Sequence, residues 1–248
     1  MPWDFVLILL VLGIVVPLLG RRRIRHLIKL PFTSKLDRLT LYASTFAFQW
    51  ATAGLILWRA DARSITLKEL AIGIPRPALT LTLSVVLSVL FFANQILSLK
   101  RLSTQPANRS GVLVHLATKI FPQDSIERLA FVALVIAVAF CEEFIYRGFI
   151  QSVFQRATGA VSLGIIVSAV FFASAHLYQG RLGLASTFAV GLLFAAVRSW
   201  SGSLAPSISV HFVTDLTVGF LAPIRTRTAP ASSSAIQRTE SAAADRQP

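Results

Sequence analysis

Six ionisable residues interrupt long apolar stretches in the second half of the sequence. They are Glu142, Glu143, Arg147, His176, His211 and Asp215. An ionisable side chain in the centre of a membrane costs about 2.5–3.5 kcal/mol on insertion scales. Such residues are therefore the first place to look for function. Carboxylates and imidazoles that converge can bind a metal, activate a water molecule or relay protons.

The two adjacent glutamates have different surroundings if their stretch is helical. Glu143 and Arg147 are four residues apart, so they share one face and can form an ion pair. Glu142 points about 100° away from that face and has no local partner. A carboxylate without a partner is suited to general acid–base work. We therefore favour a chemical role for Glu142, whereas Glu143 and Arg147 could equally be structural.

The histidines take their meaning from their neighbours. His176 closes an apolar run and, alone, would be an ordinary interfacial or core histidine. Asp215 follows His211 by four residues and shares its helical face. A carboxylate that binds one imidazole nitrogen fixes which nitrogen the ring presents. Because all six residues lie on three separate stretches, they can converge only inside a bundle.

Composition predicts that this bundle lies in a membrane. The chain has 248 residues, 54% of them hydrophobic and 14% charged, against about 25% charged in soluble domains. Apolar runs of about 20 residues match the thickness of a bilayer. We predict an all-α, polytopic transmembrane bundle of about seven spans. The predicted spans are residues 2–20, 39–58, 78–99, 129–149, 160–177, 182–200 and 204–222.

The net charge of +13 does not indicate nucleic-acid binding. The basic residues lie beside the apolar runs, where they set topology and meet anionic headgroups of membrane lipids. They concentrate in alternate connections, at 21–38, at 100–128 and in the C-terminal tail. The positive-inside rule places these connections and the tail in the cytoplasm, and the N-terminus outside. The single cysteine, Cys141, excludes a disulfide framework and a cysteine-based zinc site.

Three parts are expected along the chain. Residues 1–124 form N-terminal transmembrane helices and a cytoplasmic connection, and residues 125–222 form the core that carries the polar residues. A helix is expected to begin near Asp124 or Ser125, a good N-cap followed by Glu127. Residues 223–248 are rich in Ser, Ala, Thr and Pro and are expected to be a disordered cytoplasmic tail.

The polar residues form three motifs that resemble those of the CPBP family. The motifs are Glu-Glu-xxx-Arg at 142–147, Phe-xxx-His at 172–176 and His-xxx-Asp at 211–215. The family contains type II CAAX prenyl endopeptidases and bacterial intramembrane peptidases tied to bacteriocin processing and immunity. The resemblance covers about residues 125–222. It implies an intramembrane metalloendopeptidase in the plasma membrane of a prokaryote, acting on a prenylated or other membrane-anchored peptide.

The resemblance also implies roles for the site residues. Glu142 and His176 would activate the attacking water, and His211 and Asp215 would polarise the scissile carbonyl. Many relatives have Asn where this chain has Asp215, so Asp215 fits better as an acceptor that orients His211. Two alternatives to a peptidase are a non-proteolytic immunity or scaffold protein of the same family and a proton-coupled carrier.

The sequence does not decide whether the site binds a metal. Glu143 or Glu142, together with His176 and His211, could form a zinc site with two histidines, one glutamate and an open position. Equally, Glu142 and His176 could activate water without a metal. One difficulty concerns depth, because Glu142 would lie about 20 Å from the cytoplasmic end of its span while His176 lies near that end of its own. The two meet only if a helix begins below the membrane surface or tilts strongly.

Overall fold

A computed structural model describes residues 1–103 and 119–227, and within these ranges every regular element is a helix. The predicted all-α fold is therefore confirmed. Two helical segments are continuous through a π-helical stretch: residues 3–29 (α1, η1 and α2) and residues 125–158 (α6, η3 and α7). The elements are α1 (Trp3–Leu10), η1 (Val11–Val15), α2 (Val16–Lys29), α3 (Lys35–Asp61), α4 (Pro77–Ser103), α6 (Ser125–Glu143), η3 (Phe144–Ile150), α7 (Gln151–Thr158), α8 (Val161–Ala175), η4 (Leu177–Gln179), α9 (Gly180–Ser201) and α10 (Ala205–Arg227).

All seven predicted spans fall on helices, but the helices differ in length and apolarity. Four helices in the described part of the chain are long and apolar enough to cross a membrane: Trp3–Lys29, Pro77–Arg101, Ser125–Thr158 and Leu177–Ser201. The apolar helices Val161–Ala175 and Ala205–Leu221 are shorter. Helix α10 continues past the predicted end at 222 to Arg227. The predicted tail beyond that point lies outside the described residues.

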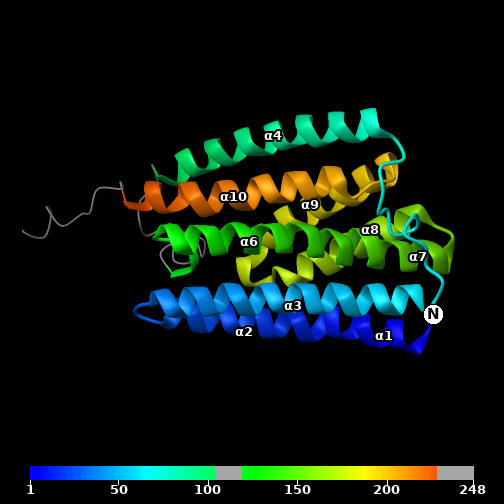
Figure 1. The fold of residues 1–248 in the computed structure, drawn as a ribbon, viewed down its shortest axis with the longest axis horizontal. Coiled ribbons are helices and arrows are strands. Elements are labelled where there is room, and N and C mark those ends of the chain that lie inside the picture. The colour runs from blue at the N-terminus through cyan, green and yellow to red at the C-terminus, as the bar shows by residue number, and fades with distance from the viewer. Residues whose placement is uncertain (104–118, 228–248) are drawn as a thin grey trace, which may run out of the picture.

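The long helices lie roughly side by side along one axis (Figure 1). Helix α4 forms one edge and packs on α10, whereas α1, α2 and α3 form the opposite edge, with α6 between the two groups. Helix α3 packs on α6, and α8 packs on α9. The N-terminus lies at the same end as the turn between α7 and α8 (Figure 1). The six predicted site residues lie on α6, η3 and α10 and at the C-terminal end of α8.

A buried ion pair sets the register of α3 on α6. Arg38 donates from Nε and Nη2 to the two carboxylate oxygens of Glu127, at 3.0 and 2.7 Å. Both side chains are almost fully buried. Further along, the rings of Tyr42 and Phe131 are in edge contact, with centroids 5.6 Å apart. Because the two helices run in the same direction, this register carries forward to the middle of the bundle.

The connection between α3 and α4 folds back onto the bundle. The hydroxyl of Ser152 donates to the carbonyl of Glu69 at 2.5 Å, and the amide of Leu204 donates to the carbonyl of Ala71 at 3.1 Å. Gly148 lies so close to this connection that a Cβ there would be 3.2 Å from the carbonyl oxygen of Leu70 and 3.5 Å from Leu204. The connection therefore fixes the start of α10 against the end of η3.

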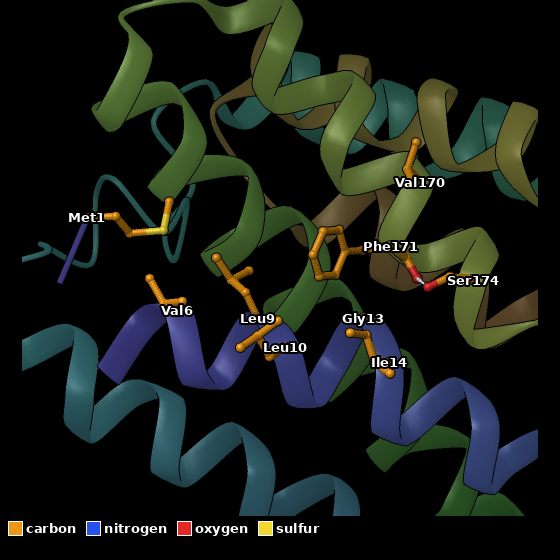
Figure 2. Close-up of a pocket in the computed structure, with 9 residues that line it drawn as sticks. All are labelled: Met1, Val6, Leu9, Leu10, Gly13, Ile14, Val170, Phe171 and Ser174. Carbon is orange, nitrogen blue, oxygen red and sulfur yellow. Dashed lines mark hydrogen bonds between the residues drawn. The ribbon is translucent and has the colours of Figure 1, made fainter. Parts of the chain in front are cut away.

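The first helix contributes to the core rather than standing apart. Phe5 packs edge-on against Phe149 with centroids 5.0 Å apart, in the same buried cluster as Leu9 and Leu12. Beside this contact, α1 and α8 leave a groove of about 330 Å³ lined almost entirely by apolar side chains (Figure 2). Phe171 projects from α8 into the groove towards Gly13, where a Cβ would be only 2.9 Å from its ring.

We predict that Glu127→Gln lowers the free energy of unfolding by about 1.5–3 kcal/mol, because it weakens two charge-assisted hydrogen bonds of a buried guanidinium. Thermal melting in detergent would measure the loss. Lys35→Gln is the matched control, since Lys35 joins the same two helix ends through Asp124 at 2.7 Å with both side chains nearly half exposed. A control that destabilises as much as Glu127→Gln would contradict the assigned importance of the buried pair.

Candidate active site

The chain brings Glu143 and His176 to one level because α8 is short. Glu143 lies fifteen residues before the end of α7 at Thr158, and His176 lies fifteen residues after the start of α8 at Val161. Antiparallel helices that rise equally per residue return to the same height. His176 therefore lies in the middle of the bundle, not at a cytoplasmic end as the sequence suggested. The difficulty over depth disappears for this reason.

His211 reaches the same level from the other direction. Leu204, just before α10, lies beside Gly148. His211 lies seven residues after Leu204 along α10, and Glu142 lies six residues before Gly148 along η3 and α6. Both paths lead from that contact towards the middle of the bundle. The carboxylates and the imidazole therefore meet half-way along the bundle. The folded-back connection between α3 and α4 sets this height.

Glu143 is the buried centre of the site. Its Oε1 accepts hydrogen bonds from Arg147 Nη1 at 2.9 Å and from His211 Nδ1 at 3.0 Å. The side chains of Glu143 and Arg147 are fully buried, and the predicted ion pair between them is present. The guanidinium carbon of Arg147 lies 3.9 Å from the ring centre of Phe172, a cation–π contact that helps to offset the loss of water.

His211 lies between two carboxylates. Its Nδ1 faces Glu143, and its Nε2 is 3.5 Å from Asp215 Oδ2. The sequence predicted that Asp215 orients the ring, but the closer partner is Glu143, on a different helix. Asp215 also interacts electrostatically with Glu142 and His176. Asp215, His211, Glu142 and His176 are therefore near one another in the bundle.

The tautomer of His176 follows from its partner. Nδ1 lies 2.8 Å from the carbonyl oxygen of Phe172. A carbonyl can only accept, so Nδ1 carries the proton and the lone pair of the neutral ring is on Nε2. The ring also packs against Phe172, with centroids 4.8 Å apart. The last turn of α8 thus holds the imidazole in one orientation with one nitrogen free to accept a proton.

Glu142 has a partner that the sequence did not indicate. Gln49 Nε2 donates to Glu142 Oε1 at 2.9 Å from helix α3. The other oxygen, Oε2, is buried and has no hydrogen-bond partner among the described residues. In the sequence, the feature that could have indicated this contact is Gln49 itself, a single amide between Tyr42 and Ala53 on the packing face of α3. Spacing along the chain could not connect it to Glu142.

The site is more accessible towards one end of the bundle. Glu142, His176 and Asp215 are half-buried, whereas Glu143 and His211 are buried. Glu142 precedes Glu143 in α6, and Asp215 follows His211 in the antiparallel α10, so each half-buried residue is displaced towards the end where α3 and α6 begin. His176 ends α8 on that same side. The three less buried residues of the site are therefore displaced towards the end that carries the basic residues of α2.

The arrangement does not favour the zinc ligands predicted from sequence. Glu143 Oε1 already accepts from Arg147 and His211, and a cation would face the neighbouring guanidinium. His176 donates from Nδ1 to a carbonyl, which leaves Nε2 able to bind a metal, so the objection concerns Glu143 alone. Within residues 1–103 and 119–227, no three His, Cys, Asp or Glu side chains are grouped as metal ligands. Zinc bound by Glu143, His176 and His211 stays a prediction, and no step below depends on it.

The comparison with known families agrees with the motifs. Residues 124–217 match the model described as Type II CAAX prenyl endopeptidase Rce1-like. Over this segment the chain is similar to the Rce1-like family. The match confirms the predicted resemblance to the CPBP family and has nearly the predicted extent. The Rce1-like segment begins at Asp124, which caps α6 by accepting from the amide of Glu127, and it contains all six predicted site residues. Gln49 lies outside it.

The chain also resembles an uncharacterized 24.3 kDa protein of Escherichia coli. The two are 34% identical over 98 residues, which cover 38% of this chain and 45% of that protein. The aligned part is thus less than half of the curated relative. No solved structure matches the chain.

Arg147→Ala is predicted to destabilise the protein by about 3–5 kcal/mol, because it leaves Glu143 as a buried charge without its guanidinium. Glu142→Gln should destabilise far less, since Gln can still accept from Gln49. Thermal melting in detergent compares the two variants. Arg156→Ala, which removes an exposed guanidinium 3.6 Å from Glu69, serves as the control. Equal melting temperatures for Arg147→Ala and Glu142→Gln would contradict the structural role of the pair.

Proposed function

We propose that this protein is an intramembrane peptidase that hydrolyses a peptide bond of a lipidated, CAAX-like or otherwise membrane-anchored peptide. The observation that carries the proposal is the pair of free proton acceptors in the middle of the bundle. Glu142 Oε2 has no hydrogen-bond partner within residues 1–103 and 119–227, and Nε2 of His176 carries a lone pair because Nδ1 is bonded to the carbonyl of Phe172. Groups of this kind activate water.

The proposed reaction begins with a water molecule between Glu142 and His176. Glu142 Oε2 takes a proton from the water as its oxygen forms a bond to the carbonyl carbon, and the π electrons of the carbonyl move to its oxygen. The tetrahedral intermediate then collapses and the C–N bond breaks. The departing nitrogen takes the proton held by Glu142. The products are a carboxylic acid and an amine, and Glu142 returns to its starting state.

His211 is suited to the negative oxygen of that intermediate. Its Nδ1 is bonded to Glu143, which keeps the ring in place, and its Nε2 edge faces the space beside Asp215. When Nε2 is protonated, it donates to the carbonyl oxygen as charge develops there. A preorganised donor in a site with little water gives one of the largest rate effects known in enzymes. Glu143 and Arg147 hold His211 and do not touch the substrate.

The proposed substrate class rests on the similarity to the Rce1-like family, and the proposed orientation rests on the positions of the half-buried polar groups. The half-buried polar groups lie towards the end where α2 brings its basic residues, which the positive-inside rule places in the cytoplasm. The plasma membrane of a prokaryote and a cytoplasmic C-terminal tail belong to the same proposal. A peptide with a lipid at its C-terminal cysteine would keep the lipid among the apolar helices while its scissile bond reaches the middle of the bundle from that end. A non-proteolytic immunity or scaffold protein is the alternative.

Glu142→Gln should abolish cleavage, because Gln keeps the shape but cannot take a proton from water. General-base contributions are about 10²–10⁴-fold, so the rate should fall by at least 100-fold. The assay uses a fluorescence-quenched peptide with a farnesylated C-terminal cysteine, and the same peptide without the lipid, in proteoliposomes. Glu69→Gln, an exposed carboxylate outside the site, is the control. Undiminished cleavage by purified Glu142→Gln protein would refute the assignment, and binding of the peptide by the unaltered protein without cleavage would favour the scaffold alternative.

Activity should also survive removal of metals. Glu143 Oε1 already accepts from Arg147 and His211, which supports a reaction that needs no zinc at Glu143. We expect the chelator-washed protein to cleave the peptide at its original rate, with zinc far below one per chain in elemental analysis. About one zinc per chain, lost with activity and restored with it, would instead establish the predicted site, and its occupancy should then fall as the histidines become protonated.

A further inference from the structure

We infer that Gln49 is a positioning residue for the general base, supplied by a helix outside the Rce1-like segment. The inference rests on the proposed peptidase function. Gln49 is 8% exposed, and its Nε2 donates to Glu142 Oε1 at 2.9 Å. Helix α3 lies outside residues 124–217. The N-terminal part of the chain therefore contributes to the site and does more than surround it.

Gln49 occupies the packing face of α3, where an apolar residue would be expected. The buried residues of this face are Arg38, Tyr42, Gln49, Ala53, Ile56 and Ala60. Their spacing by three, four and seven residues is that of one helical face. A buried amide costs free energy unless its hydrogen bonds are made. The hydrogen bond to Glu142 is the interaction that repays the burial of this amide.

The packing of α3 on α6 fixes where the Gln49 amide points. Arg38 pairs with Glu127, Tyr42 packs against Phe131, and the stacked rings of Trp50 and Phe140 have centroids 5.7 Å apart. These contacts lie on both sides of Gln49 along α3. The amide therefore approaches Glu142 from a helix that is held at its beginning and just beyond Gln49. It is not a loosely placed surface group.

The chemistry of the amide gives the two oxygens of Glu142 different tasks. An amide NH₂ group can only donate, so Oε1 must remain an acceptor whether or not the carboxyl group is protonated. A proton taken from water must then reside on Oε2, which has no hydrogen-bond partner in the described part of the chain. Gln49 thus orients the carboxylate and ensures that the proton-accepting oxygen is the free one. It does this without touching the substrate.

A double-mutant cycle tests the interaction independently of activity. Gln49→Met keeps the length of the side chain and removes the donor, and Glu142→Met removes the acceptor. In detergent, Gln49→Met should lower the melting temperature of the wild-type protein and have little effect in the Glu142→Met background. Tyr42→Phe is the matched control, because it removes one hydrogen bond, to the carbonyl of Ile120, from the same face of α3. Its effect should be the same in both backgrounds. Equal effects of Gln49→Met in the two backgrounds would overturn the inference.

Kinetics with the farnesylated peptide test the positioning role. Gln49→Met should lower kcat by roughly 10- to 100-fold, as expected for loss of a hydrogen bond to a charged group, with KM nearly unchanged. Tyr42→Phe should leave kcat unchanged. An unchanged kcat in Gln49→Met would overturn the inference while leaving the peptidase proposal intact. If the wild-type protein cleaves neither peptide, the peptidase proposal fails, and the melting cycle still decides whether Gln49 holds Glu142.

Discussion

The buried carboxylate of Glu143 is the point on which the site depends. One oxygen accepts from Arg147 on the next turn and from His211 on α10. Breaking such a pair by removing one partner costs several kcal/mol because the other charge remains away from water. Through the hydrogen bond from His211, the Glu143–Arg147 pair therefore ties the end of α6 to α10. Its remaining polar atoms, Glu143 Oε2 and Arg147 Nε and Nη2, are buried without hydrogen-bond partners among the described residues.

Two rings offset part of that cost. The guanidinium of Arg147 lies over Phe172 on α8 and 5.3 Å from the ring centre of Phe194 on α9. The same Phe172 contributes the carbonyl that fixes the tautomer of His176. Phe172 therefore contacts the guanidinium that stabilises Glu143 and also orients His176. The second motif of the sequence, Phe-xxx-His, has a physical explanation in these two contacts.

The fold divides the site into a rigid part and an accessible part. Glu143, Arg147 and His211 are buried, and their mutual contacts leave them little freedom. Glu142 and His176 keep a free oxygen and a free nitrogen, and both are half-buried. A π-helical segment, η3, follows Glu143 directly, and such segments are frequent at functional sites. Buried charge thus holds the proposed proton acceptors in place without occupying them.

The sequence by itself determined the class of fold, the helix that begins at Asp124 and the ion pair of Glu143 with Arg147, because each depends on local composition or on spacing within one helix. The sequence did not determine the distances between helices. The tertiary structure decided that α8 ends at the middle of the bundle, that His211 turns to Glu143 more closely than to Asp215, and that Gln49 reaches Glu142. Each of these depends on the length of a neighbouring helix or on its register, which Arg38 and Glu127 set for α3, and no periodicity along a single segment contains that information.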